Sequence, residues 1–556
     1  MDRSTSECAD SQDPEAAEPR GETVSQPIVA GVRSADLLEG RCPGSYLGTD
    51  CGVEGTGMWH SLSGFMEDKD DCLDLARCFP LVRPAYQPRC VGARIRAQGA
   101  GSVKLELRSA DGRVLWWATQ DLLLGEGRQE LNFSWDPAKL NRVKSLHWET
   151  ESGVDFELES LELEIRMPRL PFEQEVFLVS YAKLARLYSP DEGTVRERAP
   201  QSAGRRDCTA AAGLFCLATA AAYKMGLVKR AQADQILRKI SGTVAEIPRV
   251  SGLLPMSTCK EEGVHTVARG STYSVLHTSL YYHGVLLAAQ LLWDGKTLAN
   301  TINAVREIDF SRLRDSEEYV AKGLSEDGKT LLDGRWCDWG GETALVMLLE
   351  SMATGHLVRP ELNGVGKVRG GVGLSAEIGS LFYPDFSADE RDTVTRVNWR
   401  EVRRAHLDEQ RGYFPRKRPR SAATRMGLYG LSLGEDPDGE GYVVAGTDTG
   451  PKEELIRPHY ILMSGLVERH PVVTYHALRT MKDTKLLSPW GMVGGFSRKL
   501  EPVPLVGSFS AGLECIASYH LLKEATGGLD HIYAAAEDCG LTREAIRALY
   551  PAIQTW

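Results

Sequence analysis

The hydrophobic pattern of this chain changes its period once, and the change divides the sequence into two unlike parts. Before about residue 167, apolar and polar residues alternate, as in VKLELRSA and RVLWWATQ, which is typical of strands with one buried face. Beyond MPRLPFEQE (167–175), apolar residues recur every three or four positions, which is typical of helices. The sequence therefore predicts a multidomain β + α fold, with a β domain followed by a helical domain.

The β domain is predicted over residues 43–168 as an antiparallel, jelly-roll-like β-sandwich similar to carbohydrate-binding modules. Short strands alternate with turn signals such as the Asp-Gly pair at 111–112. Trp116 and Trp117 are adjacent, so one of them should enter the core and the other should point outward. The outward ring would either stack on a sugar or pack against the neighbouring domain.

The remaining boundaries follow from composition and period. Residues 1–42 are polar and acidic and are expected to be a disordered leader. Residues 169–176 are expected to be a linker, and residues 177–556 a helical domain of ten to twelve helices. Because fully apolar helices alternate with amphipathic ones, we predict two concentric rings, an (α/α)6 toroid with the functional pocket at one end. A superhelical array is the alternative, but no fixed period supports it.

The charge balance excludes nucleic acid as the main partner. The chain has 65 basic and 76 acidic residues, a net charge of −11, and its one basic stretch, 411–425, is expected to be a solvated loop. No segment reaches the roughly 20 apolar residues that a membrane helix requires, and no signal peptide is recognised. These features predict a cytoplasmic protein with no membrane partner, whose oligomeric state is unknown.

The cysteines are distributed unevenly. Six of the twelve lie before residue 91, and the spacings within 42–90 fit no zinc motif. Free buried thiols are one interpretation, and disulfides within 42–90, which would imply export, are the other. The Gly-rich stretch 364–373 lacks the ending of a phosphate loop, and no HExxH motif occurs, so neither a metal nor a cofactor is expected.

The helical part resembles the glucoamylase-like toroid domain of bacterial endo-β-1,2-glucanases and of enzymes of cyclic β-1,2-glucan metabolism. The resemblance spans about residues 205–525 and lies in the order of motifs. GLYGLSLGEDPDGEGYVVAGTDTG is similar to their GLTASDGP turn, a proline-led helix follows at IRPHYILMSG, and SPWGMVGGFSRKLEPVPLVGSFSAGLECIASYHLL is similar to their last turn and inner helix. CTAAAGLFCLATAAAYKMG, STYSVLHTSLYYHGVLLAA and DWGGETALVMLLESMATG resemble earlier inner helices.

The resemblance implies a glycoside hydrolase that cleaves a β-glucan, β-1,2-linked, with an oligo- or polysaccharide as its substrate. Three departures bear on this expectation. Thr272 and His277 stand where the SEVSSIDT motif of such proteins has its Glu and its Asp. The late GIDQGP turn is replaced by LVGSFSAG, which includes Ser508 and has no acid.

Glycoside hydrolysis requires a protonated acid and a second carboxylate on either side of the scissile bond. Asp338 and Glu342 open a long apolar helix and would share one of its faces. Because two acids on one helix rarely flank a bond, one of them is paired here with Asp207 or Glu514, which lie at other inner helices. The alternative assigns Asp338 and Asp207 to helix N-caps and Glu342 to a first turn.

Aromatic and hydrogen-bonding residues are the expected sugar contacts. Tyr273, His277 and Tyr281 are four apart and would form one face of a helix, either toward the pocket or as a polar seam between helices. The full set predicted to bind substrate is Trp336, Trp339, Tyr273, His277, Tyr281, Tyr460, Trp490 and Arg369.

Two other functions fit the same fold. One is a non-catalytic carbohydrate-binding or scaffold protein whose toroid has lost its acids. The other is a polysaccharide lyase in which Tyr281 and His277 act as base and acid, and Arg335 or Arg369 near the pocket would favour it because a uronate needs a cation beside it.

Overall fold

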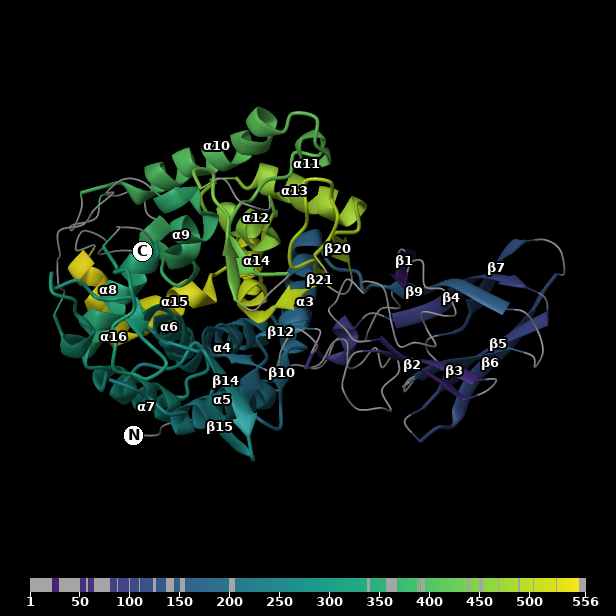
Figure 1. Cartoon of the computed structure of the whole chain (residues 1–556), viewed down its shortest axis with the longest axis horizontal. Helices are drawn as coiled ribbons and strands as arrows, with labels where there is room; N and C mark the ends of the chain where they lie inside the picture. The colour runs from purple at the N-terminus through teal and green to yellow at the C-terminus, as the bar shows by residue number, and fades with distance from the viewer. Residues whose placement is uncertain are drawn as a thin grey trace, which may run out of the picture.

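The computed structural model describes most of the helical part and the strands of the N-terminal part. The described residues are 23–29, 51–56, 59–64, 81–87, 89–99, 101–109, 111–123, 127–136, 145–150, 156–199, 206–337, 341–356, 368–387, 389, 391, 396–437, 441–449, 454–468, 470–488, 491–503, 505–526 and 528–549. Figure 1 shows the helices gathered on one side of the molecule and the N-terminal strands on the other.

The N-terminal strands form two antiparallel sheets. The first has the order β1-β9-β4-β7 and the second the order β2-β3-β8-β5-β6. Their bounds are β1 Thr23–Val29, β2 Cys51–Thr56, β3 Trp59–Gly64, β4 Arg89–Gly99, β5 Gly101–Arg108, β6 Val114–Leu122, β7 Arg128–Ser134, β8 Ser145–Thr150 and β9 Phe156–Arg166. The jelly-roll-like sandwich and the domain boundaries stay predictions.

The hairpin expected around the Asp-Gly turn is present, and it separates the two tryptophans. Strand β5 pairs with β6, with Leu107 opposite Trp116 and Glu106 opposite Trp117. The Trp116 ring lies 5.1 Å from the ring of Trp135, whereas Trp117 is 59% exposed. Trp117 therefore points to solvent, and the alternative of packing against a neighbouring domain is wrong.

One strand falls within the expected leader. Thr23–Val29 forms β1 and pairs with the edge of β9, with a register shift at Pro27. Proline is tolerated on an edge strand because its missing N–H can face away from the ladder. The proline and the surrounding polar residues conceal this strand from a pattern analysis. The rest of the leader lies outside the described residues.

Within the described part of the chain, six helices contact one another in a closed cycle. In cyclic order they are α4 (Thr209–Lys224), α6 (Val275–Leu291), α8 (Gly341–Thr354), α9 (Gly373–Glu377), α12 (Pro458–Ser464) and α14 (Ser508–Thr526). They are buried almost all round, as the apolar sequences predicted. This cycle is the inner ring of the toroid (Figure 1).

A second layer of helices covers this ring from outside. Helix α3 (Phe172–Ala185) packs on α14, α5 (Arg230–Glu246) on α4, α7 (Gly295–Arg306) on α6, α10 (Trp399–Lys417) on α9 and α13 (Val472–Asp483) on α12. Helix α15 (His531–Asp538) packs on α6, and α16 (Gly540–Leu549) packs on α8. In α5 the buried residues follow the spacing of three and four that predicted it. The superhelical alternative is wrong because the cycle closes from α14 back to α4.

Two glycines let the backbones of α4 and α6 touch. A Cβ on Gly213 would lie 2.4 Å from the Cα of Tyr281, and one on Gly284 would lie 2.3 Å from the carbonyl oxygen of Gly213. Ordinary side chains would hold the two helices apart, so these glycines fix the close crossing at the centre of the ring.

Short pairings join the segments that enter the inner helices. Strand β12 (Arg198–Ala199) pairs with β22 (Val506–Gly507), and β13 (Asp207–Cys208) pairs with β14 (Ser257–Glu261). Strand β16 (Tyr273–Ser274) pairs with β17 (Gly323–Leu324). The N-termini of α4, α6 and α14 therefore lie at the same end of the toroid, and their partial positive charges make this end favourable for carboxylates.

No helix among the described residues is long and apolar enough to cross a membrane. The six described cysteines outside the strands of the N-terminal part are free thiols, namely Cys208, Cys216, Cys259, Cys337, Cys515 and Cys539. The alternative of disulfides within 42–90 involves side chains outside the described ones.

Candidate active site

Two glutamates, Glu197 and Glu435, meet where β12 pairs with β22. Glu197 precedes Arg198, which lies opposite Gly507 in the pair, and Ser508 donates its N–H to the carbonyl oxygen of Glu197 at 2.9 Å. The carboxyl group of Glu435 packs on Gly507, where a Cβ would lie 1.7 Å from its Cδ atom. Both side chains are almost fully buried, at 6% and 2% exposure.

Glu435 is held at the N-terminus of α14. The N–H of Ser510 donates to Glu435 Oε1 at 3.1 Å, and the Ser510 hydroxyl donates to Oε2 at 2.5 Å. Glu435 ends strand β18 (Leu433–Glu435), and Arg457 donates to its backbone carbonyl at 2.9 Å. Hydrogen bonds on both oxygens and on the backbone fix the orientation of this carboxyl group.

Glu197 has a different environment. Burial raises its pKa and the negative charge of Glu435 adds to the rise, whereas the Ser257 hydroxyl and the Arg198 guanidinium oppose it. Ser257 donates to Oε2 at 2.9 Å, and Arg198 Nε lies 3.7 Å from Oε1. A carboxyl group with a raised pKa beside a second, fixed carboxyl group is the arrangement that acid–base catalysis at a glycosidic bond requires.

Rings and a thiol surround the two acids. His277, Tyr442 and Phe509 form a triangle with centroid separations of 6.5 Å, 6.1 Å and 5.8 Å. His277 and Tyr442 keep part of their surface accessible, yet burial lowers the pKa of His277 to about 4 and raises that of Tyr442 well above its usual value. Cys208 is buried among Glu197, Glu435 and Tyr442, and burial raises its pKa to about 12, so its thiol is neutral.

The loop after Glu435 is anchored by Arg198. Its guanidinium donates to the carbonyl oxygens of Asp436, at 3.0 Å, and Gly441. The short strand β19 (Tyr442–Val444) follows and pairs with β18. Arg198 thus joins the segment that carries Glu197 to the segment that carries Glu435 and Tyr442.

The predicted acids occupy several different positions. Asp207 is buried in strand β13 beside the cluster. Burial raises its pKa to about 6, the charges of Glu192 and Glu197 add to the rise, and Thr194 and Arg196 oppose it. Glu514 forms a buried ion pair at 2.7 Å with Lys183 of the outer helix α3, and burial raises its pKa to about 6.

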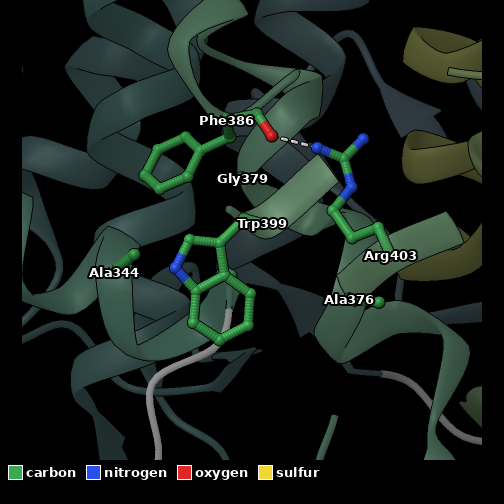
Figure 2. Close-up of a pocket in the computed structure, with 7 residues that line it drawn as sticks. Ala344, Ala376, Gly379, Phe386, Trp399 and Arg403 are labelled. Carbon is green, nitrogen blue, oxygen red and sulfur yellow. Dashed lines mark hydrogen bonds between the residues drawn. The ribbon is translucent and has the colours of Figure 1, made fainter. Parts of the chain in front are cut away.

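Glu342 lies in the first turn of α8, as predicted, and is half-buried. Ser375 at the start of α9 donates to its Oε2 at 2.7 Å. Beside this turn is a small cavity formed by Gly341, Ala344, Ala376, Gly379, Phe386, Trp399 and Arg403, none of which is acidic. Figure 2 shows the Phe386 and Trp399 rings at this cavity, with Arg403 donating to the carbonyl of Phe386. Asp338 lies outside the described residues.

The predicted helical stripe is wrong for Tyr273, whereas His277 and Tyr281 both lie in α6, four residues apart. The helix begins only at Val275, because Ser274 caps it and accepts from the N–H of His277, so Tyr273 belongs to strand β16. Tyr281 borders a groove between the outer helices α5 and α7. Among Tyr273, His277 and Tyr281, only His277 has its ring in the aromatic triangle beside Glu197 and Glu435.

The remaining predicted sugar contacts are buried or outside the description. Tyr460 was expected at the rim, but it is fully buried against Gly373 and Tyr429, since the proline-led helix runs inside the ring. Trp336 is 7% exposed beneath Lys322, whose Nζ lies 3.0 Å from the ring centroid. Trp339 and Trp490 lie outside the described residues, as does the side chain of Arg369.

Neither Glu197 nor Glu435 was predicted from the sequence. Glu435 is the acid of GLSLGEDP, within the very motif that carries the resemblance, and a residue-by-residue reading of that turn would have found it. Glu197 lies in a loop without a motif, and its position becomes clear only from a strand pairing with residues more than 300 positions away. Among the described residues, no group of three or more His, Cys, Asp and Glu could hold a metal ion.

Substituting Gly507 should separate the structural and chemical roles of this junction. In Gly507→Ala the new Cβ would occupy the space of the Glu435 carboxyl group, so this side chain must move. Because a displacement of about 1 Å can cost about 100-fold in rate, we expect a loss of that order in kcat. Gly295→Ala, whose Cβ would meet nothing within 4 Å, is the matched control and should keep full activity. Equal activity of both variants would contradict this placement of Glu435.

The class that this geometry defines is a helical toroid with a carboxylate-containing site at one end. One similar solved structure is a β-1,2-glucanase from Parabacteroides distasonis, with a TM-score of 0.58 and 11% identity over 96% of this chain and 99% of the other. Another is an endo-β-1,2-glucanase from Chitinophaga pinensis, with a TM-score of 0.55 and 14% identity over 68% of this chain and 98% of the other. A glucoamylase-like protein from Bacteroides caccae has a TM-score of 0.57 and 15% identity over 68% of this chain and 97% of its own. At such identities the likeness concerns the fold. No protein-family model and no curated protein matches the sequence.

Proposed function

We propose that this protein is a glycoside hydrolase that cleaves a β-glucan, with β-1,2-linked glucan as its substrate. The observation that carries the proposal is the convergence of Glu197 and Glu435 at the end of the toroid, beside a partly accessible aromatic triangle. The choice of substrate is supported by the toroid neighbours that are described as β-1,2-glucanases, one of them in complex with sophorotriose and glucose.

In this proposal Glu197 is the general acid. Its raised pKa lets it keep a proton at a higher pH than an exposed glutamate does, and protonation of the glycosidic oxygen compensates the charge that develops on the leaving group. Glu435 acts on the opposite side of the bond, as base toward water or as nucleophile, with its orientation fixed by Ser510. Neutral His277 and the Tyr442 ring form the sugar-binding wall.

Several residues that were predicted from the sequence also have a role in the proposed site. Glu342, fixed by Ser375, contacts the substrate or adjusts the charge of the site. Asp338 stays a candidate catalytic acid, and Trp339, Trp490 and Arg369 stay proposed contacts. The lyase alternative needs Tyr281 as its base, but this residue is 3% exposed and burial raises its pKa well above the usual value, which disfavours the ionised phenol. Arg335 is paired with Asp315 and Glu317, away from the two glutamates.

A glycan panel distinguishes the three functions. The full chain is incubated with β-1,2-, β-1,3- and β-1,4-glucans and with uronic-acid polymers, and reducing ends are measured together with absorbance near 235 nm. We expect reducing ends from β-1,2-glucan without absorbance. Absorbance would establish a lyase, and binding of a glucan without any product would establish a binding protein.

A further inference from the structure

A groove on the outside of the toroid, between α5 and α7, is large enough for a ligand of its own. Its volume is about 750 Å³, within the range of small-molecule sites. It lies between the outer helices α5 and α7 and over Tyr281 and Tyr282 of the inner helix α6, and neither Glu197 nor Glu435 is among the residues that line it. We define the α5–α7 groove by Ser241, Gly242, Arg249, Tyr282, Asn300 and Asn303.

The sequence of α5 creates the hollow. On the face toward α7 this helix has Ser241, Gly242 and Ala245, whose side chains are small or missing. A Cβ built on Gly242 would meet nothing within 4 Å. A glycine in the interior of a helix lowers stability, and here no close backbone approach requires it, so the space above it is the one structural consequence of its presence.

The polar groups of the groove include both donors and acceptors. Asn300 and Asn303 are exposed on α7, and Arg249 and Glu307 lie at one end. Tyr282, of the inner helix α6, is 1% exposed, and burial raises its pKa to about 12. It forms part of the groove wall, so the exposed amides of Asn300 and Asn303 are the groups that a ligand would meet.

The charges of the groove largely cancel. Arg238 is paired with Asp294 at 2.9 Å, and Glu307 offsets one of the two cations Arg249 and Lys296. This balance suits a neutral ligand with many hydroxyl groups better than a polyanion.

An exposed tryptophan lies just before α7, three residues before Lys296 of the groove lining. Trp293 is 73% exposed and has a φ of +51°, a left-handed conformation that bulky residues rarely adopt. The next residue, Asp294, binds Arg238 of the groove lining. An exposed indole held by a strained turn beside amides and hydroxyls is a combination that fits a sugar ring.

We propose that the α5–α7 groove is a second, non-catalytic carbohydrate site that holds a short segment of a neutral glucan chain. The identity of the glucan rests on the proposed function, whereas the site itself does not. A polymer that engages both the groove and the catalytic end is bound with higher apparent affinity than a short oligosaccharide, because its second contact is intramolecular.

The test fills the groove without touching the catalytic end. Full-length Gly242→Trp places an indole in the open space, and Gly242→Ala is the matched control. Both are measured by electrophoresis through gels that contain polymeric β-1,2-glucan, in a Glu435→Gln background so that the polymer stays intact. We expect Gly242→Trp to weaken retardation about tenfold and Gly242→Ala to leave it unchanged. With active enzyme, hydrolysis of sophorotriose should stay within about twofold in both variants.

The outcomes separate this proposal from the proposed function. If Gly242→Trp binds the polymer like Gly242→Ala, or if no glucan retards the protein, the groove is no carbohydrate site. If inorganic phosphate, and no glucan, raises the Tm of Gly242→Ala but not of Gly242→Trp, the groove binds anions and the proposal is wrong. If Gly242→Trp weakens retardation relative to Gly242→Ala, but the protein without the Glu435→Gln change cleaves no glucan, the groove is a carbohydrate site and the proposed hydrolase function is wrong. As a second variant, Trp293→Ala should weaken retardation in the same direction.

Discussion

Replacing either glutamate of the proposed pair with glutamine should reduce kcat on β-1,2-glucan by about 10²- to 10⁴-fold, the usual contribution of an acid or base group. Glutamine preserves the size of both side chains and can still accept from Ser257 or Ser510, so the fold should persist. The matched control is Glu342→Gln, which removes a carboxylate at a neighbouring helix start and should cost much less. Initial rates of reducing-end release at saturating substrate measure all three.

The pH dependence of the activity tests whether Glu197 and Glu435 interact. Since catalysis by Glu197 needs its protonated form, activity should fall as pH rises through its raised pKa. Removing the charge of Glu435 takes away one cause of that rise, so the pKa of Glu197 should decrease in Glu435→Gln. The residual activity of this variant should therefore be lost at a lower pH than that of the wild type. A profile that keeps its alkaline limb would show that the two groups do not interact.

The second large effect concerns stability. Lys183 on α3 and Glu514 on α14 form an ion pair at 2.7 Å, with side chains 1% and 2% exposed. Breaking such a pair on one side leaves an uncompensated buried charge, so Lys183→Met should lower the free energy of unfolding by about 3–5 kcal/mol. Urea titration of the purified variant measures the loss.

The double variant decides what Glu514 does. Lys183→Met combined with Glu514→Leu removes both charges, and an apolar pair of similar volume should recover most of the lost stability. If Glu514 is structural, this double variant should hydrolyse glucan at close to the wild-type rate. A stable but inactive double variant would make Glu514 a catalytic residue, as its position in the last inner helix first suggested.

The helical architecture was predictable because its cause is local. Fully apolar segments such as CTAAAGLFCLATAAAYKMG can be buried only inside a second layer of helices, and amphipathic segments such as that of α5 supply this layer. The hairpin of β5 and β6 was predictable from alternation and one Asp-Gly turn for the same reason. The edge strand β1 was missed because a proline and polar residues obscure its period.

The site was less predictable because it depends on contacts between distant segments. Asp207 was proposed from its place before a helix and stays a prediction, since it is buried and the charge of Glu197 contributes to its raised pKa. Tyr273 was expected on the same helix as His277 and Tyr281, but the capping serine at 274 begins that helix only at Val275. Glu197 reaches Glu435 only through the pairing of β12 with β22, which no local pattern contains.

We propose that the scissile bond lies between Glu197 and Glu435. A structure of the Glu435→Gln variant with a β-1,2-gluco-oligosaccharide is the most direct test of this position. We expect a glycosidic oxygen within about 3 Å of a carboxyl oxygen of Glu197, with residue 435 on the other side of the sugar. The His277 and Tyr442 rings should contact the same sugar. An oligosaccharide bound across Glu342 or elsewhere in the toroid, with Glu197 out of reach of every glycosidic oxygen, would contradict it.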